Sequence, residues 1–539
     1  MRDDVIEEDA GSGAGEVTTS RMVRSSAVVA VGTAASRVSG LVRVGVVAAV
    51  LGGGALADAY ALANNTPNIV YELILGGVLT ATLVPIFVEQ ATRDDPDGAS
   101  AIVTVSTVVL LAITILGVLA APLIFSLYSW KLTEQEAATQ AELAVPFIRM
   151  FMPQMLFFGW TALATALLNA KRRFFLPAFV PVLNNVVVSL ALLAAAAVAG
   201  EALGFDVVRE NTNLQLIIGF GTTAGIAAMT MPLIPALGRA GWRLRWRLDW
   251  RHPAVRQVVR LSGWTIGYVA ANQIGLAIVL ALAYEGEGWV AAYTYAFVFF
   301  QLPHGLIAVS FMTTFVPELA DAANGRDWAS YRQRLSLGIR LMTTLILPAS
   351  VGYILLSRPL VSVLLQRSNF SAANAALTAE VLASFAFGLV GFSVYLFALR
   401  GFYALRDTRT PFLLNVVENI LQIAVAFALV GPFEVQGLAL AFAFSYTVSA
   451  VLGLVVLGRR VGGIDGRRLT GSLARLSVAS AVMGVAVWAV TRTVGDASGG
   501  EAVLQVAVAV VVGVTVYALA LLLLRAEEFG GLRTRLLHR

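Results

Sequence analysis

The stretch AIVTVSTVVLLAITILGVLAAPLIFSLY, residues 101–128, contains no charged side chain and sets the environment of this fold. A helix needs roughly 20 mostly apolar residues to cross the hydrocarbon core of a bilayer, and this stretch exceeds that length. The rest of the chain has a similar composition, because 58% of its 539 residues are hydrophobic and only 13% are charged. Soluble domains carry about 25% charged residues, so we expect most of this surface to face lipid.

Apolar runs of comparable length recur on both sides of this stretch, separated by glycine, proline and charged residues. They predict an all-α integral membrane protein with about fourteen transmembrane helices. The predicted spans are 26–51, 60–89, 101–128, 144–169, 177–199, 214–238, 257–283, 289–317, 334–356, 377–403, 411–430, 434–457, 472–493 and 502–524. The second span is interrupted by asparagines and Pro67. Such helices survive in a membrane only inside protein or beside a water-filled cavity.

The basic residues of the loops alternate along the chain. Cytoplasmic loops of membrane proteins carry an excess of lysine and arginine. With the N-terminus inside, the even-numbered connections are cytoplasmic, and these are the basic ones: 171–173, 239–251, 326–334, 406–409, 459–468 and the tail from Arg525. The pattern predicts that both termini, N and C, are cytoplasmic. It also explains the net charge of +5 without a nucleic-acid partner.

The order of spans and loops predicts five segments. Residues 1–24 lack the apolar core of a signal peptide and are interpreted as a disordered cytosolic tail. The segments expected after it are an N-terminal lobe of helices one to six (25–240), an amphipathic inter-lobe linker (241–256), a C-terminal lobe of helices seven to twelve (257–457), and two extra helices with a basic cytosolic tail (458–539).

A weak internal repeat favours two pseudo-symmetric lobes. LLNAKRRFFLPAFVPVLNNVV at 167–187 and FYALRDTRTPFLLNVVENIL at 402–421 both combine a basic turn, a proline and an asparagine-rich helix. Internal repeats in transporters usually mark two halves with the substrate path between them.

The linker region also has a distinctive sequence. GWRLRWRLDWRHPAVRQVVR, residues 241–260, alternates tryptophan or leucine with arginine. We expect it at the membrane surface, with tryptophan among the headgroups and arginine on anionic lipid. A protein-docking role is the alternative.

Several motifs occur in one order over helices one to eleven. They are SRVSGLVRVGVVAAVLGGGALADAYALANNTPN at 36–68, LVPIFVE at 83–89, LLNAKRRFFLPAFVPVLNNVV at 167–187, FQLPHGLIAVS at 300–310 and GFYALRDTRTP at 401–411. In this order they resemble the MurJ/MviN family of lipid II flippases, which belongs to a larger group with multidrug exporters and polysaccharide flippases. The last two predicted helices carry no such motif.

The resemblance implies two lobes around a central cavity that opens to either side in turn, in a bacterial inner membrane. The substrate would be lipid II, an undecaprenyl-diphosphate-linked peptidoglycan precursor that is flipped from the inner to the outer leaflet. A flippase for another lipid-linked oligosaccharide or polysaccharide is the main alternative. A multidrug exporter is a weaker one, because arginines in helix one would repel cationic drugs. Cell-wall synthesis proteins could be partners.

The resemblance also assigns candidate substrate-binding residues. Arg37 and Arg43 match the positions where the family places arginines facing the cavity, and a diphosphate is suited to planar bidentate donors. Arg37 could instead extend to the cytosolic headgroups. Asp58 matches a family aspartate that could pair with an arginine when the outer gate is shut, or it could cap its own helix. Arg149 could supply a further positive charge, or it could simply lie near the outer interface.

Other positions depart from the family pattern. Where the better-known members carry a basic pair after the PN of helix two, this chain has Tyr71 and Glu72, and Gly76 replaces an acidic residue. Val44 stands where an acid is expected, and AFVFFQLP at 296–303 lacks the family's arginine. Part of the positive charge expected in the cavity is therefore absent. Glu72 could neutralise a helix-one arginine or act as a protonatable coupling group.

Two further groups are candidates for gating and coupling. Pro303 and Gly305 lie in the middle of the eighth predicted helix and form the best hinge candidate. Asn272, Asn415, Glu418 and Asn419 supply amide and carboxylate oxygens of the type that a hard cation prefers, and some family members have a sodium site in this lobe. Interhelical hydrogen bonding by asparagine is the alternative for this group.

The sequence lacks the residues that several other mechanisms need. It has no cysteine, only three histidines far apart, and no GxxxxGK[ST] phosphate-binding loop, so neither a confident metal site nor ATP hydrolysis is expected. We expect no enzyme activity and no cofactor. Coupling to Na⁺, to H⁺ or to the membrane potential remains open.

Overall fold

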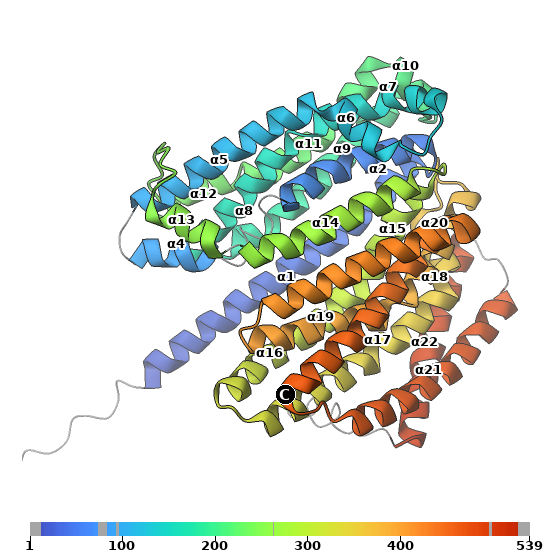
Figure 1. Ribbon diagram of the computed structural model, residues 1–539. Helices are drawn as coiled ribbons and strands as arrows, with labels where there is room; N and C mark the ends of the chain where they lie inside the picture. Colours follow the sequence, from blue (N-terminus) through green and yellow to red (C-terminus); the bar gives the residue numbers. More distant parts are fainter. Residues whose placement is uncertain (1–11, 74–82, 93–95, 262, 495–498, 526–539) are drawn as a thin grey trace, which may run out of the picture.

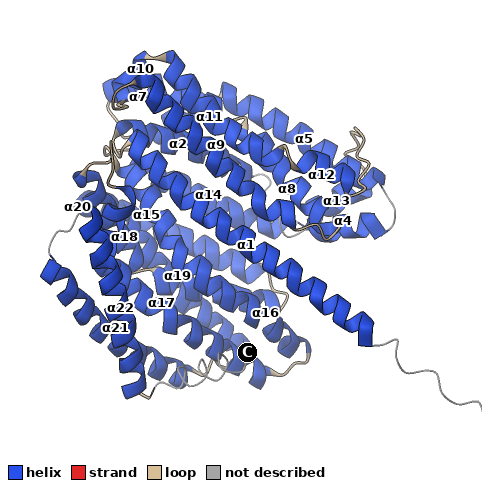
Figure 2. Cartoon of the chain, turned by 180° about the vertical axis from the view of Figure 1, so that it is seen from behind, coloured by secondary structure: helices blue, strands red, loops and turns tan. Residues whose placement is uncertain are grey.

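The structure is a computed structural model, and it describes residues 12–73, 83–92, 96–261, 263–494 and 499–525. Every regular element in these ranges is a helix, which confirms the predicted all-α class (Figures 1 and 2). The first half contains α1 (Ser12–Leu51), α2 (Ala55–Tyr71), α4 (Leu83–Thr92), α5 (Pro96–Leu119), α6 (Ala121–Tyr128), α7 (Glu134–Phe151), α8 (Gln154–Ala170), α9 (Phe175–Ala199), α10 (Phe205–Glu210), α11 (Thr212–Thr230) and α12 (Leu233–Arg239).

The second half begins with α13 (Pro253–Leu261), a short helix after the extended linker. It continues with α14 (Gly263–Ala283), α15 (Trp289–Pro303), the π-helical turn η2 (His304–Ala308), α16 (Val309–Asn324), α17 (Trp328–Leu365), α18 (Ala372–Ala386), α19 (Leu389–Ala404), α20 (Arg409–Val461), α21 (Gly466–Val494) and α22 (Gly499–Leu523).

The number of membrane crossings differs from the prediction. By length and composition, the described residues contain 11 helices able to cross a membrane, or up to 12 if the bent pair α18 and α19 is one span. Part of the difference lies in α20, whose 53 residues are counted once although Glu434 has a non-helical backbone. That break coincides with the predicted boundary between spans 411–430 and 434–457. The count of fourteen and the sides of the termini stay predictions.

The helices pack as two bundles that lie side by side in both ribbon views. In the first bundle, α9 packs against α1 and α11, while α8 packs against α4 and α5. In the second, α20 packs against α14 and α19, and α17 packs against α18. Contacts between the bundles are made chiefly by α2 with α15, by α14 with α6 and by α1 with α17. We call these the N-terminal bundle (α1–α12) and the C-terminal bundle (α14–α22).

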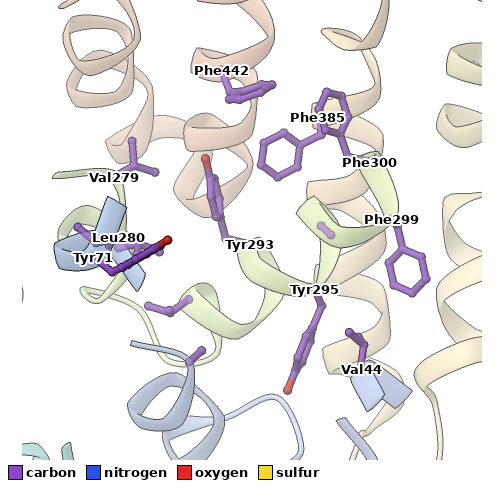
Figure 3. Packing of buried hydrophobic residues seen from close by; sticks show 14 of the residues in the cluster. Val44, Tyr71, Val279, Leu280, Tyr293, Tyr295, Phe299, Phe300, Phe385 and Phe442 are labelled. Atoms are coloured by element: carbon purple, nitrogen blue, oxygen red, sulfur yellow. The ribbon is translucent and has the colours of Figure 1, made fainter. Parts of the chain in front are cut away.

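Aromatic side chains form the centre of the C-terminal bundle. Phe385 of α18 lies 4.9 Å from Tyr293, 5.4 Å from Phe300 and 5.3 Å from Phe442, measured between ring centroids (Figure 3). Such pairs contribute about 0.5–1.5 kcal/mol each beyond the apolar area that they bury. The cluster therefore fixes α15 against α18 and the second part of α20. Helices α21 and α22 form a separate apolar cluster against α17.

Candidate functional site

Arg37 lies against the broken helix of the C-terminal bundle. A Cβ atom at position 305 would be 2.5 Å from Nη2 and 2.7 Å from Cζ of Arg37, so only glycine permits this approach without displacing the guanidinium group. Gly305 is the second residue of η2, the turn that begins directly after Pro303. The structure thus brings together Arg37, Pro303 and Gly305, which the sequence analysis assigned to two separate groups.

The break in this helix follows from Pro303. Proline has no N–H group, so the carbonyl of Phe299 loses its usual partner four residues later. The hydroxyl of Tyr353 in α17 donates to this carbonyl at 2.9 Å instead. One residue after the proline, His304 Nδ1 lies 3.0 Å from the Ser393 hydroxyl of α19. The π-helical turn is therefore held by side chains from two neighbouring helices.

Arg43 occupies a different face of α1. Six residues separate it from Arg37, which corresponds to about 9 Å along the helix axis and a rotation of about 240°. Both arginines are half-buried. Neither forms an ion pair with another residue in the described ranges, and Nε of Arg43 is buried there without a hydrogen-bond partner. Their positive charges are therefore not neutralised by a neighbouring carboxylate.

Asp58 connects the two bundles. Its Oδ2 accepts a hydrogen bond from the backbone N–H of Gly288 at 2.5 Å, and its Oδ1 accepts one from Ala291 at 2.8 Å. Through these two bonds, Asp58 caps the first turn of α15, and it is only 3% exposed. It does not cap its own helix, because the N-cap position of α2 is Gly54, which has no side-chain cap. In return, Glu287 Oε1 accepts from the N–H of Ala55 at 3.4 Å. Each helix start is thus capped by a carboxylate from the other bundle.

Further inter-bundle contacts gather at the same end of the molecule, on the right in Figure 1. Lys131 forms an ion pair with Glu285 at 2.7 Å, and the Tyr284 hydroxyl donates to Gln140 at 2.6 Å. Asn369 Nδ2 donates to the backbone carbonyl of Val50 at 2.7 Å. All of these residues belong to odd-numbered connections or the adjoining helix ends, which the loop-charge pattern predicts to be outside. We call this set of contacts, with the Asp58 and Glu287 caps, the outer latch.

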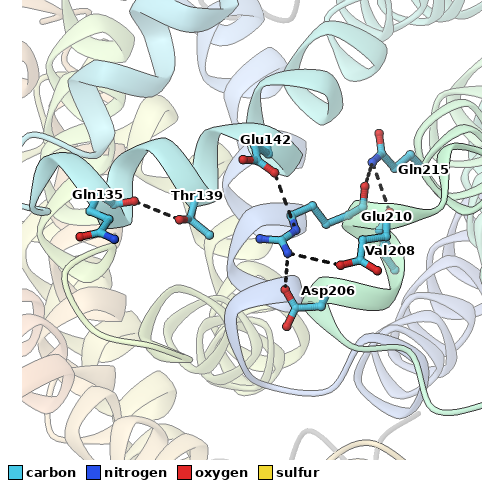
Figure 4. A network of polar contacts seen from close by, with 8 residues as sticks. Gln135, Thr139, Glu142, Asp206, Val208, Glu210 and Gln215 are labelled. Atoms are coloured by element: carbon cyan, nitrogen blue, oxygen red, sulfur yellow. Dashed lines mark hydrogen bonds and ion pairs between the residues drawn. The ribbon is translucent and has the colours of Figure 1, made fainter.

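A second polar network stiffens the N-terminal bundle near the outer latch. Arg209 of α10 lies 3.1 Å from Asp206, 3.5 Å from Glu210 and 3.7 Å from Glu142 of α7 (Figure 4). Gln215 of α11 donates to the backbone carbonyl of Arg209 at 2.9 Å. The ion pairs join α10 to α7 and the Gln215 hydrogen bond adds α11, so these contacts stay within one bundle.

The predicted cation group comes together between α14 and both parts of α20. Asn272 Oδ1 accepts from the side-chain amides of Asn415 at 3.0 Å and Asn419 at 3.3 Å. Glu418 accepts from Asn419 at 3.0 Å and from the Ser445 hydroxyl at 3.0 Å. These are the interhelical hydrogen bonds of the alternative interpretation.

The same group retains features that suit a cation. Asn415 and Glu418 are fully buried, and Oδ1 of Asn415 has no hydrogen-bond partner among the described residues. Amide and carboxylate oxygens are ligands for hard cations. No cluster of three or more His, Cys, Asp or Glu that could hold a metal occurs in the described part of the chain. A cation here would depend on asparagine oxygens together with Glu418.

The two remaining candidates are not joined to this arrangement by polar contacts. Arg149 is exposed on α7, and Glu72 is half-buried directly after α2. Within the described ranges, Arg149 forms no ion pair with Asp58, and Glu72 forms none with Arg37 or Arg43. Gly76 lies outside the described residues.

Sequence reasoning missed several contributors. Glu287 and Gly288 appeared only as a loop, and the contribution of Tyr353 depends on a carbonyl more than fifty residues away. Ser445 is one hydroxyl among many in an apolar helix. Pro303 was a detectable signal for a freed carbonyl, but the identity of its new partner depends on tertiary packing.

Two solved structures have a similar architecture. The structure aligns with one titled "Lipid II flippase MurJ, inward closed conformation" at a TM-score of 0.75, with 20% identity over 95% of this chain and 99% of that chain. It also aligns with an inward-facing multidrug resistance MATE family transporter of the MOP superfamily at a TM-score of 0.65, with 16% identity over 79% of this chain and 94% of the other. The chain therefore shares its fold with both of these proteins.

Sequence comparison is more specific. The family model described as "Lipid II flippase MurJ" matches residues 47–507. The chain is 30% identical to the probable lipid II flippase MurJ of Rhizobium tropici over 86% of each chain. It is 28% identical to the lipid II flippase MurJ of Burkholderia cenocepacia over 80% of this chain and 82% of the relative. The chain belongs to the lipid II flippase MurJ family, which confirms the resemblance found in the sequence.

Proposed function

We propose that this protein moves lipid II from the inner to the outer leaflet of a bacterial cytoplasmic membrane by alternating access. Family membership supports the substrate, and the fold supports a transport cycle between two bundles. The observation that carries the proposal is the half-buried Arg37, which lies against the broken helix without a carboxylate partner in the described residues. A transporter role requires no catalytic residue, and we assign none.

Arg37 and Arg43 are the proposed contacts for the diphosphate. Guanidinium groups stay charged in proteins and bind phosphate oxygens through two parallel hydrogen bonds. Because the two arginines lie on different faces and about 9 Å apart along α1, they are better placed to bind the diphosphate in succession than to clamp one phosphate together. Arg149, which lies outside this arrangement, is a secondary candidate.

Helix α15 provides a physical connection between the substrate contact and the outer latch. It begins at Trp289, next to the N–H groups that Asp58 caps, and ends at Pro303, next to the Arg37 contact. Its 15 residues span about 22 Å as one rigid element. We propose that an anion draws Arg37 away from Gly305, that the turn then changes shape, and that α15 carries this movement to the caps.

The energy source is a proposal of the same kind. An inward-negative potential favours outward movement of an anionic headgroup. Na⁺ or H⁺ binding among Asn272, Asn415, Glu418 and Asn419 would add a coupled ion, with Ser445 as a further oxygen. Cell-wall synthesis proteins remain candidate partners.

Complementation tests the proposal. The resident lipid II flippase is depleted in a tractable bacterium, and this chain is expressed as wild type, Arg37→Ala or Arg43→Ala. We expect wild type to restore growth and each substitution to reduce plating efficiency by at least ~10-fold, since a charge-assisted contact contributes about 1.5–3 kcal/mol. Arg459→Ala removes an exposed arginine of α20 and serves as the matched control, with membrane levels measured by blot.

A second substrate class has one specific observation in its favour. The family's expected charges are replaced at Val44 and Tyr71, and residues 296–303 contain no arginine. A different lipid-linked oligosaccharide would need fewer of these charges. Failure of well-inserted wild-type protein to restore growth would support that class. Rescue that survives both arginine substitutions would instead keep lipid II as the substrate and overturn the proposed diphosphate contacts.

A further inference from the structure

The linker between the bundles lies along α5 in an extended conformation. The backbone N–H of Arg245 donates to the Ser100 hydroxyl at 3.1 Å, and that of Arg247 donates to the Thr104 hydroxyl at 3.0 Å. Four residues of helix rise about 6 Å, and two extended residues cover about 6.6 Å, so these two pairs match in register. The segment is therefore attached to the N-terminal bundle through its backbone, and its side chains remain available.

The alternating sequence places two kinds of side chain on opposite faces of the extended segment. Trp242 is the anchor, because its Nε1 donates to the carbonyl of Leu167 at 3.0 Å and it is only 8% exposed. The later tryptophan and leucine residues of this alternating segment are exposed: Trp246 is 72% exposed, and Leu248 and Trp250 are each 51% exposed. Nothing in the described residues covers these large apolar side chains.

Positive charge surrounds the exposed tryptophans. The exposed basic residues at this end of the N-terminal bundle include Lys171, Arg172, Arg173, Arg239, Arg243, Arg245, Arg247 and Arg251. Two acids that the structure describes beside them, Asp97 at the start of α5 and Asp249, both lie against Arg247. Among the described residues, Arg243, Arg245 and Arg251 form no ion pair, so none of their charges is neutralised by these two acids. We call residues 243–251, with the loop 171–173, the basic strap.

The basic strap lies beside the ends of helices that are long and apolar enough to cross a membrane. The candidate span of α5 begins at Asp97, beside the strap, and α8 and α12 end at Ala170 and Arg239. These helix ends lie together at the left of Figure 1, near α4 and α13. Tryptophan is enriched at this interface because its ring is apolar and its N–H is polar, and cytoplasmic leaflets carry anionic lipids that attract arginine.

We propose that the basic strap binds the anionic headgroups of the adjacent leaflet, with Trp246 and Trp250 inserted among them. This contact is distinct from substrate binding, because the strap lies along α5 and not beside Arg37 or Arg43 of α1. It would hold that bundle at a fixed depth while the C-terminal bundle moves. Each basic residue near an anionic surface strengthens the association by roughly five-fold.

Brominated lipids test the proposal on the full-length chain in vesicles of phosphatidylcholine and phosphatidylglycerol. Bromine in the acyl chains quenches nearby tryptophan emission, and the linker signal is the difference between wild type and Trp246→Phe/Trp250→Phe. We expect brominated phosphatidylglycerol to quench this signal more strongly than brominated phosphatidylcholine at the same fraction. Arg243→Gln/Arg245→Gln should reduce the preference for phosphatidylglycerol by about ten-fold or more.

The matched control is Arg459→Gln/Arg467→Gln, which removes the same charge from exposed positions in and after α20. It should keep the full preference. Size-exclusion profiles and thermal midpoints establish that each variant is folded, and all four substituted arginines are exposed. Absence of quenching by either lipid would overturn the proposal and favour a protein partner for the strap. Equal quenching by both lipids, or equal loss in the control, would also overturn it.

Discussion

At the scale of single residues, the candidate site depends on one close approach. Arg37 can lie against η2 only because position 305 has no side chain, since a Cβ atom there would be 2.5 Å from the guanidinium group. Arg37 and Arg43 could be recognised from the sequence because a charged side chain in an apolar helix is costly in a membrane and usually has a function. Their spatial relation to Gly305 could not, because 268 positions separate the two sides of the contact and only packing brings them together.

Gly305→Ala should move the Arg37 guanidinium without removing its charge. We expect rescue in the depletion strain to fall by about ten-fold, because the arginine loses its resting position while the free end of the side chain can still yield. Gly352→Ala in α17 is the control, since a Cβ atom at that position would have no neighbouring atom within 4 Å. Alanine there should leave rescue intact and raise stability slightly, by about 0.5–1 kcal/mol at most. Equal rescue by both variants would argue against a role for the close approach.

At the scale of elements, α15 and η2 show how far local sequence reasoning reaches. The structure has a π-helical turn directly after Pro303 and a non-helical backbone at Glu434, at the start of the predicted span 434–457, and proline and glycine act on the local backbone at such places. The replacement of the lost hydrogen bond by Tyr353 was not predictable, since it depends on where α17 packs. The same limit applies to Asp58, whose cap belongs to a helix in the other bundle.

Tyr353→Phe should weaken the broken turn. It removes the only side-chain donor that the described residues provide to the Phe299 carbonyl, and an unsatisfied buried acceptor costs about 1–3 kcal/mol. We expect a thermal midpoint several degrees lower in detergent. Tyr403→Phe makes the same chemical change at a side chain that is 37% exposed, and it should shift the midpoint by less than a degree. Identical midpoints for the two variants would contradict a structural role for the Tyr353 hydroxyl.

At the scale of the whole molecule, the two bundles are joined at one end by the outer latch and at the opposite end by the linker. The composition and loop charges predicted the membrane environment, and the motif order predicted the family, because these signals are distributed over the whole chain. The outer latch was invisible in the sequence, because its partners are backbone groups and ordinary loop acids. The predicted segments 25–240 and 257–457 contain the latch residues of the two bundles, with Asp58 in one and Glu287 in the other.

Asp58→Ala should open the latched end more often. The chain has no cysteine, so Ala292→Cys, at a buried position of α15, introduces a single thiol. Loss of two hydrogen bonds to a carboxylate should increase its labelling by an impermeant maleimide from outside by at least ten-fold, at about 1.5–3 kcal/mol per bond. Asp206→Ala, an exposed acid of the Arg209 network, should leave the labelling rate unchanged. Unchanged labelling in the Asp58 variant would mean that the cap does not hold this end shut.

The reciprocal caps also determine what the open end would present to its surroundings. The N-terminus of a helix carries a partial positive charge of about half a unit, and its free N–H groups are suited to phosphate oxygens. While Asp58 occupies the start of α15, that charge is cancelled. Parting the bundles would expose it on the C-terminal side of the exit and leave the carboxylate on the other side. Glu287, released from α2 at the same time, would stay beside this helix start, so the open end would present a helix N-terminus with one carboxylate next to it and another across the exit.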